Sequence, residues 1–157
     1  MIVEVAVTIN ASRPAVWAAM TDIENSADFI SGIESIEILE RPQHGLVGLE
    51  WRETRMLFGK PATADKRITD ALDDEYYKTT AESDGFVFLS TNSISGSDGH
   101  ITLTSAHESI PQSIVARLWS VPMMFLFRGV MKKALLQDLN DIRAAVEQDP
   151  EQGSSGR

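Results

Sequence analysis

Residues 112–148 read QSIVARLWSVPMMFLFRGVMKKALLQDLNDIRAAVEQ and carry a long helical pattern. Apolar side chains recur there at steps of three and four residues, from Ile114 through Leu135 to Val146. We therefore predict one long amphipathic helix over this range. Pro122 lies inside it and has no amide proton to donate, so we expect a kink or a break at that position.

The sequence before this helix alternates between apolar and polar residues, as strands do. Residues 2–10 place Val3, Val5 and Val7 on one face, which predicts a strand buried on one side. Short turn-forming sequences separate six further strand candidates, at 33–41, 47–58, 62–71, 76–82, 86–95 and 100–109. Connections this short favour an antiparallel meander.

Two short helices are expected between the first strand and the second. Ser12 can cap a helix over 14–20, and Thr21-Asp22 can cap another over 23–29. The element order predicts an α+β fold in which a curved, seven-stranded antiparallel sheet wraps around the long C-terminal helix. A curved sheet and a straight helix leave a gap, which large side chains, water or a ligand must fill.

Length and composition indicate one globular domain over 1–148, followed by a flexible tail over 149–157. The chain has 157 residues, with 14 basic and 23 acidic side chains and a net charge of −9, which argues against general nucleic-acid binding. It has no cysteine and three scattered histidines, so we expect no metal site and no cofactor. Without a signal-like or membrane-spanning run, a cytoplasmic protein is expected.

Four local strings resemble those of one protein superfamily. They are NASRPAVW at 10–17, TDIEN at 21–25 followed by Asp28-Phe29, VGLEWRETR at 47–55 and ITDA at 68–71. In this order they resemble the START/Bet v 1-like (SRPBCC) superfamily, in its polyketide cyclase/dehydrase or CoxG-like branch. The resemblance covers residues 1–148 and implies the helix-grip fold. Residues 71–75, ALDDE, depart from the aromatic-Asp-Pro turn that relatives often carry.

Trp51, Glu53 and Arg55 alternate along one predicted strand and so share a face. If Trp51 faces the core, the carboxylate and the guanidinium enter the interior with it. They are tolerated there only when they pair and neighbouring strands complete their hydrogen bonds. Such a group can anchor a ligand or act as an acid/base pair, and it can equally be a structural salt bridge.

Further candidate site residues come from the last two strands and from the long helix. His107 shares its strand face with Leu103, so it is a candidate hydrogen-bond donor or general base, or a satisfied core histidine. The resemblance turns the face bearing Phe88 and Asn92 inward. Residues 118–127 are apolar all round, and we expect the cavity wall there to include Trp119, Met123 and Phe127.

Residues 112–137 contain four basic residues and no acidic one, whereas residues 22–85 contain 15 acids and 7 bases. A basic, apolar helix in an acidic protein is typical of a surface that contacts anionic lipid or an acidic partner. The alternative is a solvated face whose lysines pair with the chain's own acids. The apolar excess would also suit a second copy of the chain, as in a homodimer.

Three functions therefore stay open. The first is a module that binds a hydrophobic small molecule, such as a lipid or polyketide, in a cavity between sheet and helix. The second, which the family label suggests, is a cyclase/dehydratase with Glu53 or His107 as acid/base and Arg55 stabilising an enolate oxygen. The third is an accessory protein that docks on a membrane or partner through the basic helix.

Overall fold

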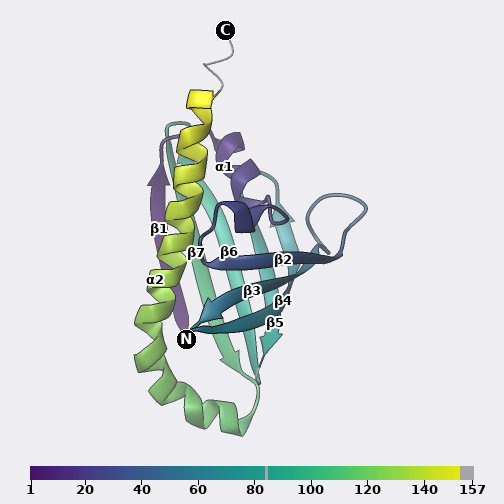
Figure 1. The fold of residues 1–157 in the computed structure, drawn as a ribbon, viewed down its shortest axis with the longest axis vertical. Coiled ribbons are helices and arrows are strands. Elements are labelled where there is room, and N and C mark those ends of the chain that lie inside the picture. Colours follow the sequence, from purple (N-terminus) through teal and green to yellow (C-terminus); the bar gives the residue numbers. More distant parts are fainter. Residues whose placement is uncertain (84, 153–157) are drawn as a thin grey trace.

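The computed structural model describes residues 1–83 and 85–152, without the side chains of residues 123, 124 and 149–152. The elements in chain order are β1 (Ile2–Ile9), α1 (Arg13–Met20), the 3₁₀ helix η1 (Ser26–Asp28), β2 (Ile33–Glu40), β3 (Glu50–Leu57), β4 (Lys60–Leu72), β5 (Tyr76–Ser83), β6 (Phe86–Ser97), β7 (His100–Pro111) and α2 (Ile114–Gln152). Figure 1 shows α2 lying along one side of the sheet, with α1 near its C-terminal end.

The strands form a single seven-stranded sheet in the order β1-β7-β6-β5-β4-β3-β2. Every neighbouring pair is antiparallel, so the predicted meander from β2 to β7 is confirmed. The first strand closes the sheet against the last, with Ile9 opposite Ile101. Irregular registers interrupt β2 and β4, and bulges of this kind bend a sheet. The result is the curved sheet around a helix that the element order predicts.

The core lies between the inner face of the sheet and the second half of α2. Ile9, Ile68 and Ile101 are fully buried on the sheet side. Leu139, Ile142 and Val146 are the buried side chains that this half of α2 contributes, at the helical spacing read from the sequence. Burial of such aliphatic side chains stabilises the docked helix by roughly 1.5–3 kcal/mol each. The C-terminal half of α2 is therefore held firmly on the sheet.

The structure corrects the predicted second helix and the predicted start of the strand at 47–58. The predicted helix over 23–29 is only the three-residue η1, because polar side chains there form local hydrogen bonds: the Ser26 hydroxyl donates to the Ile23 carbonyl, and the Asn25 amide donates to Asp22. The strand predicted to start at Val47 starts at Glu50, since Gly48 has a φ of +97° and belongs to a turn.

Helix α2 is bent, as its proline predicts. The axes of Ile114–Pro122 and Phe125–Gln148 differ by 79°. No single helix in the described ranges is long and apolar enough to cross a membrane, and these two segments meet that length and composition only when taken together. The helix continues to Gln152, past its predicted end, and the rest of the expected tail, 153–157, lies outside the described residues.

Candidate functional site

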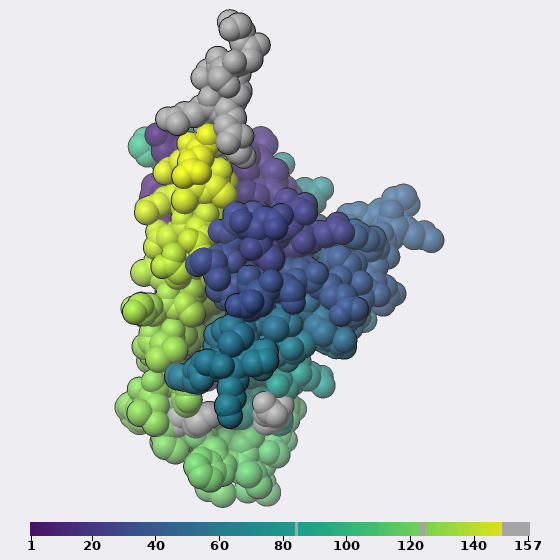
Figure 2. Space-filling view, viewed as in Figure 1, coloured from purple at the N-terminus to yellow at the C-terminus, as the bar shows by residue number. Residues whose placement is uncertain are grey.

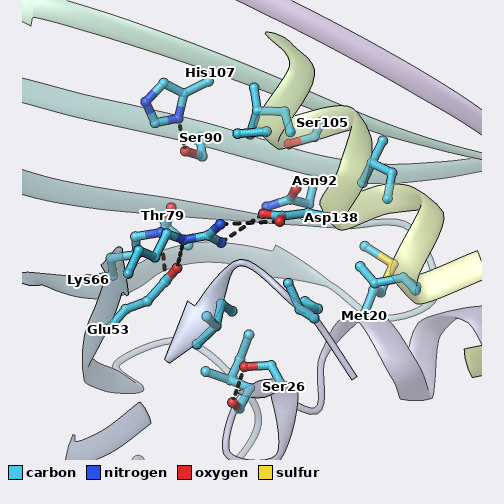
Figure 3. Close-up of a pocket in the computed structure, with 18 of the residues that line it drawn as sticks. Met20, Ser26, Glu53, Lys66, Thr79, Ser90, Asn92, Ser105, His107 and Asp138 are labelled. Atoms are coloured by element: carbon cyan, nitrogen blue, oxygen red, sulfur yellow. Dashed lines mark hydrogen bonds and ion pairs between the residues drawn. The ribbon is translucent and has the colours of Figure 1, made fainter. Parts of the chain in front are cut away.

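A cavity of about 280 Å³ lies between the inner face of the sheet, the α1–β2 region and α2 (Figure 3). Apolar lining residues come mainly from α1, the segment after it and α2, whereas the polar ones come mainly from the strands. The apolar wall comprises Ala19, Met20, Ile23, Ile30, Ile33, Trp51, Tyr77, Met131, Ala134, Leu135, Leu139 and Ile142. The polar wall comprises Ser26, Glu53, Arg55, Lys66, Thr79, Ser90, Asn92, Ser105, His107 and Asp138.

Strand alternation brings three predicted residues to this cavity together. Trp51, Glu53 and Arg55 all line it, and Trp51 and Glu53 are buried. The intervening Arg52 points outward, where it forms an exposed salt bridge with Asp65. The prediction that Glu53 and Arg55 enter the interior beside Trp51 is therefore confirmed, because β3 has no irregularity in its pairing with β4 that would shift its alternation.

The buried charges form a closed network of two acids and two bases. Glu53 accepts from Arg55 Nε at 2.5 Å and from Lys66 Nζ at 2.7 Å. The other end of the Arg55 guanidinium donates to both carboxylate oxygens of Asp138, at 3.2 and 2.7 Å. Figure 3 shows the Glu53, Lys66 and Asp138 side chains directed toward one another. Each charge is thus neutralised inside the cavity, as burial requires.

The network shifts the pKa values of its two carboxyl groups in opposite directions. Burial opposes ionisation of Glu53, but the positive charges of Lys66 and Arg55 outweigh it and lower the pKa of Glu53 to about 2. Burial raises the pKa of Asp138, and the hydrogen bonds from Arg55 offset only part of that effect. Glu53 is therefore a fixed anion at neutral pH, and a weak proton acceptor.

His107 lies in the same cavity but outside the charge network. Its Nδ1 hydrogen-bonds with the Ser90 hydroxyl at 2.8 Å, and its ring stacks on Phe88 with centroids 5.8 Å apart. Burial, aided by the charges of Lys66 and Arg55, lowers the pKa of His107 to about 4. The imidazole is consequently neutral at pH 7, and in the described part of the chain no hydrogen bond occupies its Nε2.

Of the other predicted site residues, Asn92 reaches the cavity, whereas Phe88, Trp119 and Phe127 do not line it. Asn92 lines the cavity, and no side-chain hydrogen bond engages it among the described residues. Phe88 lies behind His107 and is not part of the lining. Phe127 packs edge-on against Phe58, at 5.6 Å between centroids, and Trp119 is 64% exposed on the surface. The side chain of Met123 lies outside the described residues.

Two charged members of the site, Lys66 and Asp138, are not among the residues that the sequence predicts. Lys66 lies opposite Trp51 in the register of β3 and β4, so its position depends on a pairing that the sequence does not state. Asp138 was detectable, because it follows Leu135 by three residues on the apolar stripe of the helix, where an acid needs a partner. No group of three or more His, Asp and Glu side chains that could hold a metal ion is found in the described ranges.

Solved structures with this architecture cover nearly the whole chain. Ara h 8.0201 matches with a TM-score of 0.73 and 16% identity, over 94% of this chain and 98% of that one. A START superfamily protein from Mycobacterium smegmatis matches with a TM-score of 0.76 and 17% identity, over 94% and 97%. The Zhui aromatase/cyclase from Streptomyces sp. R1128 matches with a TM-score of 0.74 and 19% identity, over 94% of each chain. Identities this low establish the fold alone.

A curved seven-stranded sheet gripping a long C-terminal helix is the helix-grip fold of the START/Bet v 1 superfamily. Within that class, residues 9–102 match the family described as polyketide cyclase/dehydrase and lipid transport. The chain belongs to this family, and the resemblance read from its sequence is confirmed. A comparison with curated proteins gives no significant match.

Proposed function

We propose that this protein binds an uncharged, largely apolar small molecule in the cavity between the sheet and α2. The observation that carries the proposal is the neutrality of the cavity's own charges. Glu53 and Asp138 are fully engaged by Arg55 and Lys66, so the polar end of the cavity does not require a charged ligand. A charged ligand would have to compete with these largely buried ion pairs for their partners.

The hydrogen-bonding groups left over suit a hydroxyl or a carbonyl. Asn92 offers an amide, and His107 offers its Nε2, while the opposite wall is formed by side chains such as Leu139 and Ile142. An apolar wall with a few placed polar groups is the usual composition of a small-molecule site. The volume of about 280 Å³ is near the lower limit of such sites and favours a compact ligand, such as a small aromatic or a short acyl chain.

The experiment is solvent extraction and mass spectrometry of the purified protein, followed by titration with the uncharged dye 1-aminoanthracene. We expect saturable dye binding at one site. Ala134 lines the cavity although it is exposed, so Ala134→Trp fills the cavity from its rim and should abolish the binding. Ala144→Trp, on an exposed position of the same helix outside the lining, is the matched control and should bind normally.

Two results would contradict the proposal. One is the absence of both a co-purified molecule and a saturable dye signal. The other is dye binding that Ala134→Trp leaves unchanged, since the dye would then occupy a different surface. Thermal unfolding of both tryptophan variants shows whether a lost signal reflects a filled cavity or a lost fold.

A cyclase/dehydratase activity is the second candidate, because Glu53, Arg55 and His107 converge on one cavity. The pKa of Glu53 is about 2 and that of His107 is about 4, so the neutral imidazole is the stronger base of the two and the better candidate to accept a proton. Incubation with a linear poly-β-ketone thioester should then yield a cyclised product that loses water. His107→Gln should stop this turnover without stopping dye binding, and the absence of product with the unmodified protein would exclude the activity on this substrate.

A further inference from the structure

The first turns of α2 and the β3–β4 hairpin carry an extensive exposed apolar surface, which we call the docking surface. Its members are 64–85% exposed, and they are Ile114, Val115, Leu118, Trp119, Phe125 and Leu126 of α2 and Phe58 of the hairpin. In Figure 2 these first turns form the green lower end of the molecule. The edge-on contact between Phe58 and Phe127 joins the hairpin to the helix, so the surface is continuous across both elements.

Basic side chains lie within this segment of α2 and directly after it in the sequence. Arg117, Arg128, Lys132 and Lys133 are all exposed, and residues 112–137 contain no acid, although the whole chain has a net charge of −9. None of the four forms an ion pair within the described residues. The alternative in which Lys132 and Lys133 pair with the chain's own acids is therefore not realised in the described structure.

We propose that the docking surface binds the headgroup region of an anionic lipid bilayer, with Trp119 and Phe125 entering the interface. Charge complementarity selects an anionic partner and disfavours a symmetric contact with a second copy, which would bring the four basic residues of each chain together. The distribution of apolar side chains around this helical segment favours lipid over an acidic protein as the partner. Between Ile114 and Trp119 only Ala116 is buried, so apolar side chains project on nearly every side, where a protein groove would cover one stripe.

Part of α2 near the docking surface also lines the cavity, which suggests that docking could serve the exchange of a ligand. Lys132 and Lys133 follow Met131 and precede Ala134, and those two neighbours line the cavity. The two lysines and the two lining residues therefore belong to the same turn of α2 but to different faces of it, so a bilayer that the lysines contact lies one helix width from the cavity. An apolar ligand could pass between membrane and cavity without crossing bulk water. This last step depends on the proposed ligand binding, whereas the docking itself does not.

The test is co-sedimentation with vesicles of phosphatidylcholine, alone or with about 30% phosphatidylserine. We expect binding to the anionic vesicles only, and a loss of binding between about 0.05 M and about 0.5 M salt as the charges are screened. Lys132→Glu with Lys133→Glu should lower the partition coefficient by about tenfold or more, because each lysine near the surface contributes to binding. Trp119→Ser with Phe125→Ser should also abolish the binding.

The matched control is Arg67→Glu with Lys78→Glu, which changes the net charge by the same −4. Both residues are exposed, and each alternates with a buried neighbour, Ile68 or Thr79, so they lie on the outer face of the sheet. This variant should bind vesicles nearly as well as the original protein. Equal loss in the two charge variants would overturn the proposal. So would a dimer in light scattering that Trp119→Ser with Phe125→Ser dissociates, or an absence of vesicle binding by the original chain.

Discussion

Arg55 on β3 and Asp138 on α2 are 83 residues apart in the chain and are joined by two hydrogen bonds across the cavity. Arg55 also donates to Glu53, so its guanidinium connects the sheet to the helix through two carboxylates. A planar guanidinium suits this arrangement, because its donors point in fixed directions toward two partners. The polar wall of the cavity is consequently also a tie that holds α2 on the curved sheet.

Removal of the Glu53 charge should destabilise the fold strongly. In Glu53→Gln, Arg55 and Lys66 remain in the cavity with Asp138 as their only anion among the members of the network. Unfolding free energy should fall by about 3 kcal/mol or more, the usual cost of a buried charge that loses its partner. For a chain of this length that corresponds to a decrease of roughly 10 °C in the thermal midpoint, which calorimetry measures.

The neighbouring strand β4 supplies the control for this prediction. Asp65→Asn breaks the exposed pair with Arg52 on the opposite face, and its thermal midpoint should move far less. Lys66→Met added to Glu53→Gln should restore part of the lost stability, because it removes a cation that has lost its partner. A Glu53→Gln midpoint like that of Asp65→Asn would show that the network does not tie α2 to the sheet.

His107 should make stability depend on pH below neutrality. Its pKa is about 4 in the folded protein and 6.5 in an unperturbed histidine, so the unfolded chain binds more protons between these values. The free energy of unfolding therefore rises with pH in that window. Lowering the pH from 7 to 5 should reduce it by about 2 kcal/mol. This window lies above the titration of Glu53, whose lowered pKa costs stability only as the pH falls from about 4.5 toward about 2.

Urea unfolding of the original protein and of His107→Gln at pH 7 and pH 5 isolates this contribution. The variant should lose less stability between the two pH values, by the amount assigned to the histidine. His100→Gln, at an exposed position in the same strand, should behave like the original protein. Equal slopes for all three proteins would mean that His107 titrates normally in the fold.

The sequence predicts the face on which Glu53 and Arg55 lie, because alternation along a strand is a local property. It does not predict Lys66 as their partner, because that contact depends on the register between two strands. The bend at Pro122 follows from one residue's missing amide, whereas the exposure of Trp119 depends on where the bent segment points. Local chemistry can be read in the chain, and the relation between distant segments can be read only in the fold.

The β6–β7 hairpin should tolerate no side chain at Gly96. This residue has a φ of +95°, and an added Cβ would collide with the carbonyl oxygen of His100. Gly96→Ala should therefore cost about 2 kcal/mol or more, from backbone strain and from displacement of the turn. Gly129→Ala is the opposite case. An added Cβ at this helical position meets no other atom within 4 Å, so the substitution should raise the free energy of unfolding by roughly 0.5–1 kcal/mol. Denaturant midpoints of the two variants that move in the same direction would contradict this account.

Asn92 should set the preference of the cavity for a polar group on its ligand. Its side-chain amide faces the cavity and is not engaged by another side chain in the described structure, so a bound hydroxyl can use it. Calorimetric titration should therefore show tighter binding of 2-naphthol than of naphthalene. In Asn92→Leu this preference should fall by roughly fivefold, which corresponds to about one hydrogen bond, while naphthalene binding is kept or improved. Asn140→Leu on α2, outside the lining, should leave both affinities unchanged. If Asn92→Leu still prefers 2-naphthol over naphthalene, Asn92 does not bind the hydroxyl. His107 would then be the group that binds it, and His107→Gln should abolish the preference.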